Sequence, residues 1–233
     1  MALPFFFTPQ LQVGDITLDE DTSKHMTGVL RMKTGAELLL TAGNGTKAQG
    51  IIIDDHRKRC VVRIDSIEQE PEKFPKVCIA ISLLKNNARF EWFLEKATEI
   101  GVADIIPLIC ERTEKEAFRH DRMQAILISA MLQSQQCWLP QLHQPTPFTN
   151  VLATTYTNKF IAHCLPQQKQ SLYEVLKKLE GDRIMLIGPE GDFTPSEIGQ
   201  ALEKNFVPVT LGNTRLRTET AGIVAASLLC ADT

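Results

Sequence analysis

The sequence predicts an α/β protein with two domains, a small N-terminal β-barrel and a larger domain built on a mainly parallel sheet. Short strand patterns fill the first region, and strand and helix patterns alternate in the second. A polar segment with two prolines separates the two regions. Alternating strands and helices are typical of a parallel sheet covered on both faces. We therefore predict domains at residues 1–70 and 76–233, joined by a linker at 71–75.

The N-terminal region contains mostly strand patterns. Apolar runs at 36–41 and 48–54 flank Asn44-Gly45, a dipeptide that strongly favours a β-hairpin turn. Residues 59–67 alternate between apolar and polar positions, which predicts a further strand. A helix at about 21–32 interrupts these strands, and the mixture favours a small barrel.

Strands and helices alternate after the linker. A buried strand at 77–83 precedes a helix at 88–100, and Gly101 is placed to end that helix. The elements that follow continue this alternation: a strand at 104–110, a helix at 120–137, a strand at 159–164, a helix at 170–180, and strands at 184–187 and 207–211.

Two glycine-containing segments near the C-terminus are the strongest functional signal. Ile187–Phe193 and Leu211–Ala221 each follow an apolar strand and precede a helix start. The first helix begins with a capping box at Thr194–Glu197. Each loop alone is equally consistent with an ordinary turn. Because open α/β sheets bind ligands at the carboxyl ends of their strands, the two loops together predict a ligand site.

The composition excludes some functions and limits others. The 233 residues carry a net charge of −3, so attraction to a polyanion requires a local basic patch. No apolar run approaches the ~18 residues that a membrane span requires, and we expect a cytoplasmic protein with no membrane partner. The sequence has no Walker loop and no Gly-x-Ser-x-Gly motif, and Gly43-Asn44-Gly45 is a hairpin turn rather than a dinucleotide-binding motif. These observations argue against nucleotide hydrolysis and hydride transfer.

The six cysteines are scattered along the chain. None forms a Cys-x-x-Cys pair, and no histidines with ligand spacing lie beside a cysteine, so we expect no metal site. Most of the cysteines lie within apolar strand or helix patterns. We predict that they are reduced, buried thiols.

Several motifs together resemble one enzyme family. The two loops are accompanied by Lys96–Val102 with Ile106-Pro107, and by the Glu111-Arg112-Thr113 turn. His25, Val29, Leu30 and Arg31 match in spacing, as do Gln133-Ser134 and Pro140. This set resembles the RsmE-type 16S ribosomal RNA uridine-N3 methyltransferases of the SPOUT (trefoil-knotted) superfamily, over nearly the whole chain.

The resemblance implies a PUA-like RNA-binding barrel and a C-terminal α/β-knot domain that binds S-adenosylmethionine. It also implies a homodimer that methylates N3 of a uridine in 16S rRNA, within the small ribosomal subunit. Two alternatives remain open. The chain could methylate another RNA position, or it could be a non-catalytic RNA-binding protein.

The resemblance implies the cofactor-binding residues, and the chemistry of the expected reaction suggests the catalytic and RNA-binding candidates. Arg217 and Glu219 are the candidate catalytic residues, with Arg112 as a further contact. Alternatively, Arg217 only shapes the loop and Glu219 only complements a helix N-terminus. Arg31, Lys33, Lys85 and Arg89 are candidates for binding RNA phosphates. The cofactor is expected against the two loops, at Ile187, Gly188, Pro189, Glu190, Gly191, Leu211, Gly212, Leu216, Arg217 and Thr218.

The chain departs from the family pattern at four positions. Asp192 stands where many relatives have glycine, and Gly28 replaces a common arginine. Gln136 and Trp138 also occupy positions at which relatives often carry arginine. These last three changes concern RNA contacts rather than the reaction.

The last predicted helix, at 219–230, carries small residues at 221, 222, 225 and 226. Small side chains allow another helix to approach closely. The pattern is consistent with packing inside the core and with a dimer interface.

Overall fold

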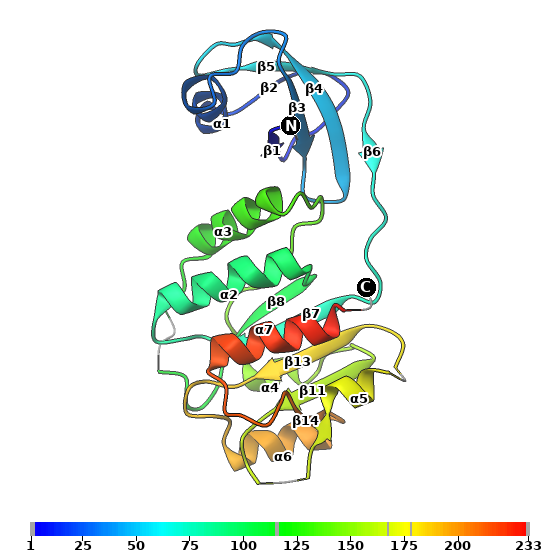
Figure 1. Cartoon of the computed structure of the whole chain (residues 1–233). Helices are drawn as coiled ribbons and strands as arrows, with labels where there is room; N and C mark the ends of the chain where they lie inside the picture. The colour runs from blue at the N-terminus through cyan, green and yellow to red at the C-terminus, as the bar shows by residue number, and fades with distance from the viewer. Residues whose placement is uncertain (1–2, 115–116, 167, 178, 232–233) are drawn as a thin grey trace. The chain divides into compact units, whose positions relative to one another are not determined.

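The computed structural model describes residues 3–114, 117–166, 168–177 and 179–231. The chain divides into two compact units. The first extends to Glu72 and includes Met131–Leu139, and the second contains Lys73–Ala130 and the chain from Pro140 onward (Figure 1). The sequence placed residues 131–139 with the second domain. They cluster with the first because backbone hydrogen bonds join them to the turn at 42–45.

The first unit contains a six-stranded sheet. Its order is β1-β3-β4-β5-β2, with β6 paired to β4. β1 runs parallel to β3, and the other pairs are antiparallel. The strands are β1 (Phe5–Phe7), β2 (Gly14–Thr17), β3 (Glu37–Thr41), β4 (Thr46–Asp54), β5 (Val61–Ile64) and β6 (Glu68–Gln69).

The predicted hairpin forms between β3 and β4, with Thr41 opposite Lys47. Gly45 has a φ of 84°, a value that glycine adopts without strain. The helix is shorter than predicted: α1 (Glu20–Lys24) begins at the Asp19 cap and continues only as a π-helical turn, His25–Val29.

The second unit contains an eight-stranded parallel sheet. Its order is β10-β8-β7-β13-β11-β14-β12, with β9 paired to β8. Every residue of β7 and β13 is buried, as expected for central strands covered on both faces. The strands are β7 (Val77–Ser82), β8 (Asp104–Ile109), β9 (Gln141–Leu142), β10 (Thr146–Pro147), β11 (Asn158–Ala162), β12 (Gln170–Ser171), β13 (Arg183–Ile187) and β14 (Val207–Thr210).

Local signals define the helix ends. Asn86 caps the first helix of this unit, which ends at Gly101 with a φ of 99°. Thr194 and Glu197 form the predicted capping box. The helix predicted at 120–137 ends earlier, at Gln133. The helices are α2 (Asn87–Ile100), α3 (His120–Gln133), α4 (Phe148–Val151), α5 (Leu172–Leu176), α6 (Pro195–Glu203) and α7 (Thr218–Leu229).

Both faces of the sheet are covered. Side chains from α4 and α6, including Phe148 and Ile198, form one buried cluster with Ala80 and Leu186. On the opposite face, α7 packs against α2, β7 and β13 (Figure 1). The predicted fold class, a small N-terminal β domain followed by an α/β domain with a parallel sheet, is confirmed.

The prediction that the cysteines are buried is wrong for Cys164, which is exposed in the loop after β11. The other five cysteines are buried. Burial raises the pKa of Cys60, Cys137 and Cys230 to about 11 and that of Cys110 to about 12. These thiols therefore stay protonated and pack as small apolar groups. Within the described ranges, no helix is long and apolar enough to cross a membrane.

Candidate functional site

The two glycine-containing loops lie at the same edge of the sheet, on either side of β11. In the sheet register, Ala162 at the end of β11 pairs with Ile187 of β13 and with Val209 of β14. The carboxyl ends of the three adjacent strands β13, β11 and β14 therefore lie side by side at the edge of the sheet. The loops that follow line one cavity of about 750 Å³.

All of the predicted cofactor-binding residues line this cavity except Gly191. Arg217, a candidate catalytic residue, lines it as well. Arg89, predicted to bind RNA, also faces the cavity. Further lining residues that the sequence analysis did not assign to the site are Ala162, His163, Cys164, Lys169, Asp192, Val209, Thr210, Asn213, Thr214, Arg215 and Ala221.

The loop after β13 is held closely by its own residues. A Cβ atom added to Gly188 would lie 3.0 Å from the Phe193 ring and 3.1 Å from the Phe193 amide nitrogen. Asp192 has a φ of 63°, which lies in the left-handed region that favours glycine. Its carboxylate accepts hydrogen bonds from the amides of Cys164 and Phe193, at 2.8 and 2.9 Å. Asp192 therefore keeps the turn and joins it to the loop after β11.

The loop after β14 leads directly into α7. The Thr210 hydroxyl donates to the carbonyl of Gly212 at 2.8 Å. Gly212 has a φ of 150°, and a Cβ atom added to it would have no neighbour within 4 Å. Arg217 is exposed at the N-cap position of α7, and Thr218 is buried as the first residue of that helix. This loop therefore presents both backbone and a guanidinium to the cavity.

The Glu111-Arg112-Thr113 turn forms hydrogen bonds with the loop after β13 and with the start of α6. The Arg112 guanidinium donates to the carbonyl of Gly191 at 2.7 Å. The Glu111 amide donates to the Glu197 carboxylate at 2.9 Å, and the Thr194 hydroxyl donates to the Glu111 carboxylate at 3.1 Å. Arg112 is not among the cavity-lining residues. Its hydrogen bond to the Gly191 carbonyl therefore stabilises the loop after β13.

Glu219 contacts Arg89, which lines the cavity. Glu219 is 6% exposed, and its Oε1 lies 3.7 Å from Arg89 Nε. The second oxygen, Oε2, has no hydrogen-bond partner among the described residues. Glu219 does not line the cavity, whereas Arg89 does. The geometry therefore joins Glu219 to the site through the Arg89 side chain.

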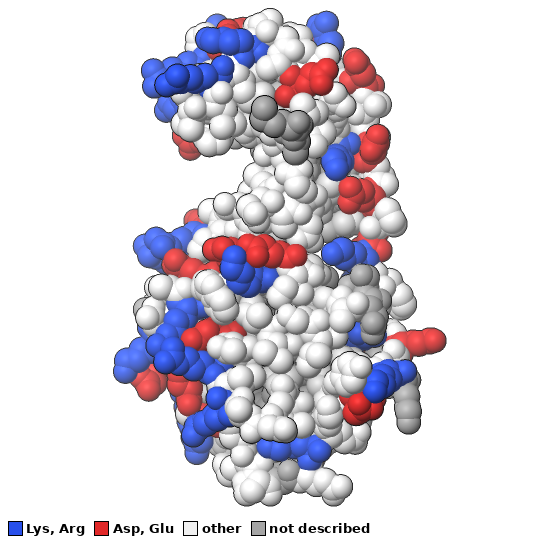
Figure 2. Space-filling view, viewed as in Figure 1, with Lys and Arg blue, Asp and Glu red and all other residues white. Residues whose placement is uncertain are grey.

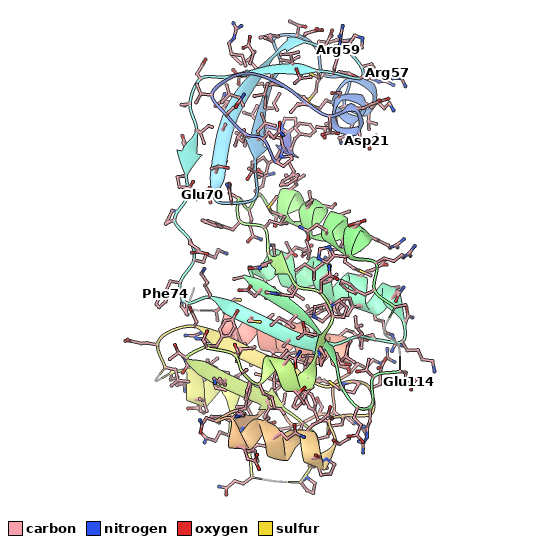
Figure 3. The ribbon with its side chains drawn as sticks, turned by 180° about the vertical axis from the view of Figure 1, so that it is seen from behind. Asp21, Arg57, Arg59, Glu70, Phe74 and Glu114 are labelled. Carbon is pink, nitrogen blue, oxygen red and sulfur yellow. The ribbon has the colours of Figure 1, made fainter. Side chains whose placement is uncertain are left out.

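The other candidate RNA-binding residues lie in both units. Arg31 and Lys33 belong to the first unit, where Lys33 Nζ lies 3.5 Å from Asp55. Lys85 belongs to the second unit and forms a 2.8 Å ion pair with Glu114, labelled in Figure 3. This hydrogen bond with Glu114 raises the pKa of Lys85, so the side chain is a fixed positive charge.

The first unit also carries basic side chains near α1. Figure 2 shows them gathered over that helix, and Figure 3 shows Arg57 and Arg59 near Asp21. Between the two arginines, Lys58 lies 3.5 Å from the Glu20 carboxylate. The patch therefore contains acidic side chains as well as basic ones.

The sequence reasoning missed the loop after β11. Its strand was predicted, but as extending to Cys164, and the structure ends it at Ala162. His163 and Cys164 are therefore the first residues of the loop after β11, as Gly188 is the first residue after β13. That β11 lies between the strands preceding the two loops follows only from the order of strands in the sheet, which the local sequence pattern does not contain. Within the part of the chain that the structure describes, no group of histidine, cysteine or carboxylate side chains could hold a metal ion.

Family models match most of the chain. The model described as an RNA methyltransferase domain matches residues 70–230, and one described as an RNA methyltransferase PUA domain matches residues 18–65. The chain is also 28% identical to the ribosomal RNA small subunit methyltransferase E of a Synechocystis species. That alignment covers 93% of this chain and 73% of the relative.

Solved structures are similar over almost the full length. A probable rRNA-methyltransferase from Porphyromonas gingivalis is 35% identical, with a TM-score of 0.91 and coverage of 98% of both chains. Ribosomal RNA small subunit methyltransferase E from Neisseria gonorrhoeae, solved bound to S-adenosyl methionine, is 27% identical. Its TM-score is 0.87, with coverage of 99% of this chain and 98% of the other.

Proposed function

The chain belongs to the RNA methyltransferase family, and on that premise we propose that it methylates N3 of a uridine in 16S ribosomal RNA. The methyl donor is S-adenosylmethionine. The main support from this chain is that both glycine-containing loops line a single cavity at the carboxyl edge of the parallel sheet.

The residues of the cavity fit this donor. A volume of about 750 Å³ suits a nucleoside with an amino-acid tail, because ligand pockets span ≈ 300–1,000 Å³. Gly188 and Gly212 expose backbone to the cavity, where amide and carbonyl groups can bind the donor. Leu211 and Leu216 supply apolar walls. When bound, S-adenosylmethionine supplies a methyl group activated by a sulfonium.

The reaction at N3 requires removal of a proton and stabilisation of negative charge on the uracil oxygens. Arg217 lies at the cavity and carries a permanent positive charge, which favours the uracil anion. Holding the two reactants in line is worth up to roughly 7–11 kcal/mol in well-oriented systems. We therefore assign the main catalytic role to Arg217.

The contacts of Glu219 and Arg112 favour different roles for these two residues. Glu219 orients Arg89 at the cavity wall through the 3.7 Å contact with its guanidinium. The second carboxylate oxygen of Glu219, Oε2, has no hydrogen-bond partner among the described residues and is the candidate proton acceptor. Arg112 holds the loop through Gly191 and acts on the cofactor only through that loop.

We also propose the partners that the family resemblance implies. The RNA substrate is 16S rRNA within the small ribosomal subunit, and the enzyme is a cytoplasmic homodimer. Arg31 and Lys33 on the first unit, with Lys85 on the second, bind phosphates of this RNA. The target uridine must be unstacked to reach the cavity.

Calorimetric titration with S-adenosylmethionine is expected to give saturable heat at one site per chain. A titration without saturable heat would favour a non-catalytic RNA-binding protein.

In a deletion strain, 16S rRNA digests analysed by mass spectrometry are expected to lack one N3-methyluridine. Complementation with the intact gene restores it. Retention of every N3-methyluridine in the deletion strain would exclude the proposed position.

Arg112→Ala is expected to weaken S-adenosylmethionine binding by about tenfold, since a hydrogen bond to a charged donor contributes ~1.5–3 kcal/mol. Arg112→Lys keeps a donor and should recover part of this affinity. Arg122→Ala is the matched control, because Arg122 pairs with Glu91 and does not line the cavity. Calorimetry measures all three. Unchanged affinity together with a reduced kcat in Arg112→Ala would instead place Arg112 at the substrate.

A further inference from the structure

Two apolar side chains are exposed next to each other on the turn that follows α1. Val29 is 68% exposed, and Leu30 is 45% exposed. Val29 is the last residue of the π-helical turn, and Leu30 is the residue that caps it. We call this pair the apolar tip of the first unit. Large apolar side chains are usually buried, so an exposed pair of them is a surface that a partner can cover.

The surrounding backbone holds the apolar tip in a defined place. Met26 and Met32, on either side of it, belong to the buried core of the first unit. The Leu30 amide donates to the His25 carbonyl at 3.0 Å, and the Met32 amide donates to the Met26 carbonyl at 3.0 Å. Because the two methionines and these hydrogen bonds fix the turn, the tip is exposed by the fold itself.

The same turn contains an unfavourable backbone conformation. Arg31 has a φ of 55°, in the left-handed region that residues other than glycine rarely adopt. The π-helical hydrogen-bond pattern of His25–Val29 is uncommon as well. Both features are found most often at functional sites, where the surrounding structure compensates for their cost. Their presence beside an exposed apolar pair therefore indicates a site of contact.

Positively charged side chains follow the apolar tip directly. Arg31 is the next residue after Leu30, Lys33 lies two positions further on, and both are exposed. Lys33 Nζ lies 3.5 Å from the Asp55 carboxylate, yet the Lys33 side chain remains 76% exposed. The turn therefore offers apolar contact area together with two cations.

This combination favours single-stranded RNA as the partner. In a double helix the faces of the bases are covered by stacking, and an apolar side chain reaches them only where a base step is opened. In a single strand the base faces are accessible, and phosphates flank them. An apolar protein surface would cover the tip but would leave Arg31 and Lys33 without negative partners. An unstacked base with its phosphates uses both the apolar and the charged groups.

We propose that Val29 and Leu30 pack against the face of an unstacked base of the RNA substrate, while Arg31 and Lys33 bind the phosphates beside that base. This inference rests on the proposed function, because it takes the substrate to be RNA. The apolar contact with a base is its new element. Through this contact the first unit distinguishes single-stranded from double-stranded segments, which phosphate contacts alone do not.

The test measures binding of the full-length protein to a fluorescently labelled single-stranded RNA and to the same strand annealed into a duplex. A double variant with Val29→Ser and Leu30→Ser is expected to bind the single strand on the order of tenfold more weakly. Its affinity for the duplex should change little. Val13→Ser is the matched control, because Val13 is 60% exposed in the same unit and has uncharged neighbours in the sequence.

The salt dependence of binding separates the apolar contact from the phosphate contacts. For single strands, each phosphate contact contributes about 0.7 to the slope of log K against log[salt]. The double serine variant should keep the wild-type slope, whereas Lys33→Ala should reduce it by about 0.7. Gly28→Arg should make the slope steeper, because a Cβ atom at Gly28 would meet nothing within 4 Å and the new guanidinium adjoins the tip.

Each result supports or overturns the proposal. Wild-type affinity of the double serine variant for the single strand would overturn the base contact and leave the proposed function intact. An equal loss for single strand and duplex would overturn it too. A changed oligomeric state of this variant with unchanged RNA binding would assign the tip to a second copy of the chain. If the wild-type protein bound neither RNA, the RNA substrate of the proposed function would fall, and this inference with it.

A measurement that keeps the side chains apolar covers the case in which the serine variants fold poorly. The methyl resonances of Val29 and Leu30, assigned through Val29→Ile and Leu30→Met, are expected to shift when single-stranded RNA is added to the wild-type protein. Those of Val13 should stay in place. Unshifted Val29 and Leu30 resonances at saturating RNA would contradict the base contact.

Discussion

Arg217→Ala is expected to lower kcat for RNA methylation by about 10²- to 10³-fold, the usual effect of removing a group that stabilises transition-state charge. Arg217 is exposed at the N-cap of α7 and lines the cavity. Because the side chain is exposed, its truncation leaves no buried cavity, and the expected loss of kcat follows from the proposed contact of the guanidinium with the uracil oxygens. Single-turnover methylation of 16S rRNA measures the chemical step, and calorimetry measures cofactor affinity.

Arg215→Ala is the matched control for this prediction. Arg215 is also exposed, lines the same cavity and belongs to the same loop, but it precedes the first residue of α7 by three positions. This variant is expected to retain most of the turnover. Both variants should keep the wild-type melting temperature. A near-normal single-turnover rate in Arg217→Ala, or an equal loss in Arg215→Ala, would contradict the specific role of Arg217.

Gly222→Ala is expected to destabilise the protein by about 1–3 kcal/mol, the typical cost of overpacking a filled core. Gly222 lies on the buried face of α7. A Cβ atom there would lie 2.7 Å from Phe93 Cε2 on α2 and 2.9 Å from Ile81 Cδ1 on β7. Both of these side chains are fully buried, so neither can move away freely. Thermal and urea denaturation measure the loss.

The same substitution at Gly199 should have the opposite sign. Gly199 lies within α6, and nothing would lie within 4 Å of an added Cβ. Gly199→Ala is therefore expected to stabilise the protein by about 0.4–1 kcal/mol, because alanine restricts the unfolded chain. Equal effects of the two substitutions would show that the close packing of α7 on α2 does not limit stability.

The Gly222 variant should also weaken cofactor binding. Thr218 and Ala221 line the cavity from the N-terminal part of α7, and Arg89 lines it from α2. A displacement of α7 from α2 moves these groups relative to one another. The small residues on α7 thus have a role inside the chain: residues 222, 225 and 226 are buried in its own core.

The elements that the sequence predicted well carry their own end signals. The Gly101 stop and the Thr194–Glu197 capping box depend on contacts within a few residues. The Asn44-Gly45 turn is equally local. In contrast, β9, β10 and β12 contain two residues each and were not predicted. Such short strands exist only because a neighbouring strand provides hydrogen-bond partners.

The same distinction explains the errors at helix ends. The predicted helix at 120–137 continued into residues that the structure places beside the turn at 42–45. There, the Gly45 amide donates to the Cys137 carbonyl, and the Leu139 amide donates to the Gly43 carbonyl. A contact across about ninety positions of sequence leaves no periodic signal in the local pattern.

By itself, the sequence determined the α/β class, the two glycine-containing loops and most of the residues that line the cavity, because strand, turn and helix signals are encoded by near neighbours. The tertiary structure alone decided that β11 lies between β13 and β14. It thereby placed His163 and Lys169 at the cavity. Arg112 and Glu219 do not line the cavity, and they contact Gly191 and Arg89 instead. The order of strands in a parallel sheet depends on packing between distant segments, and the residues that meet at its edge follow from that order.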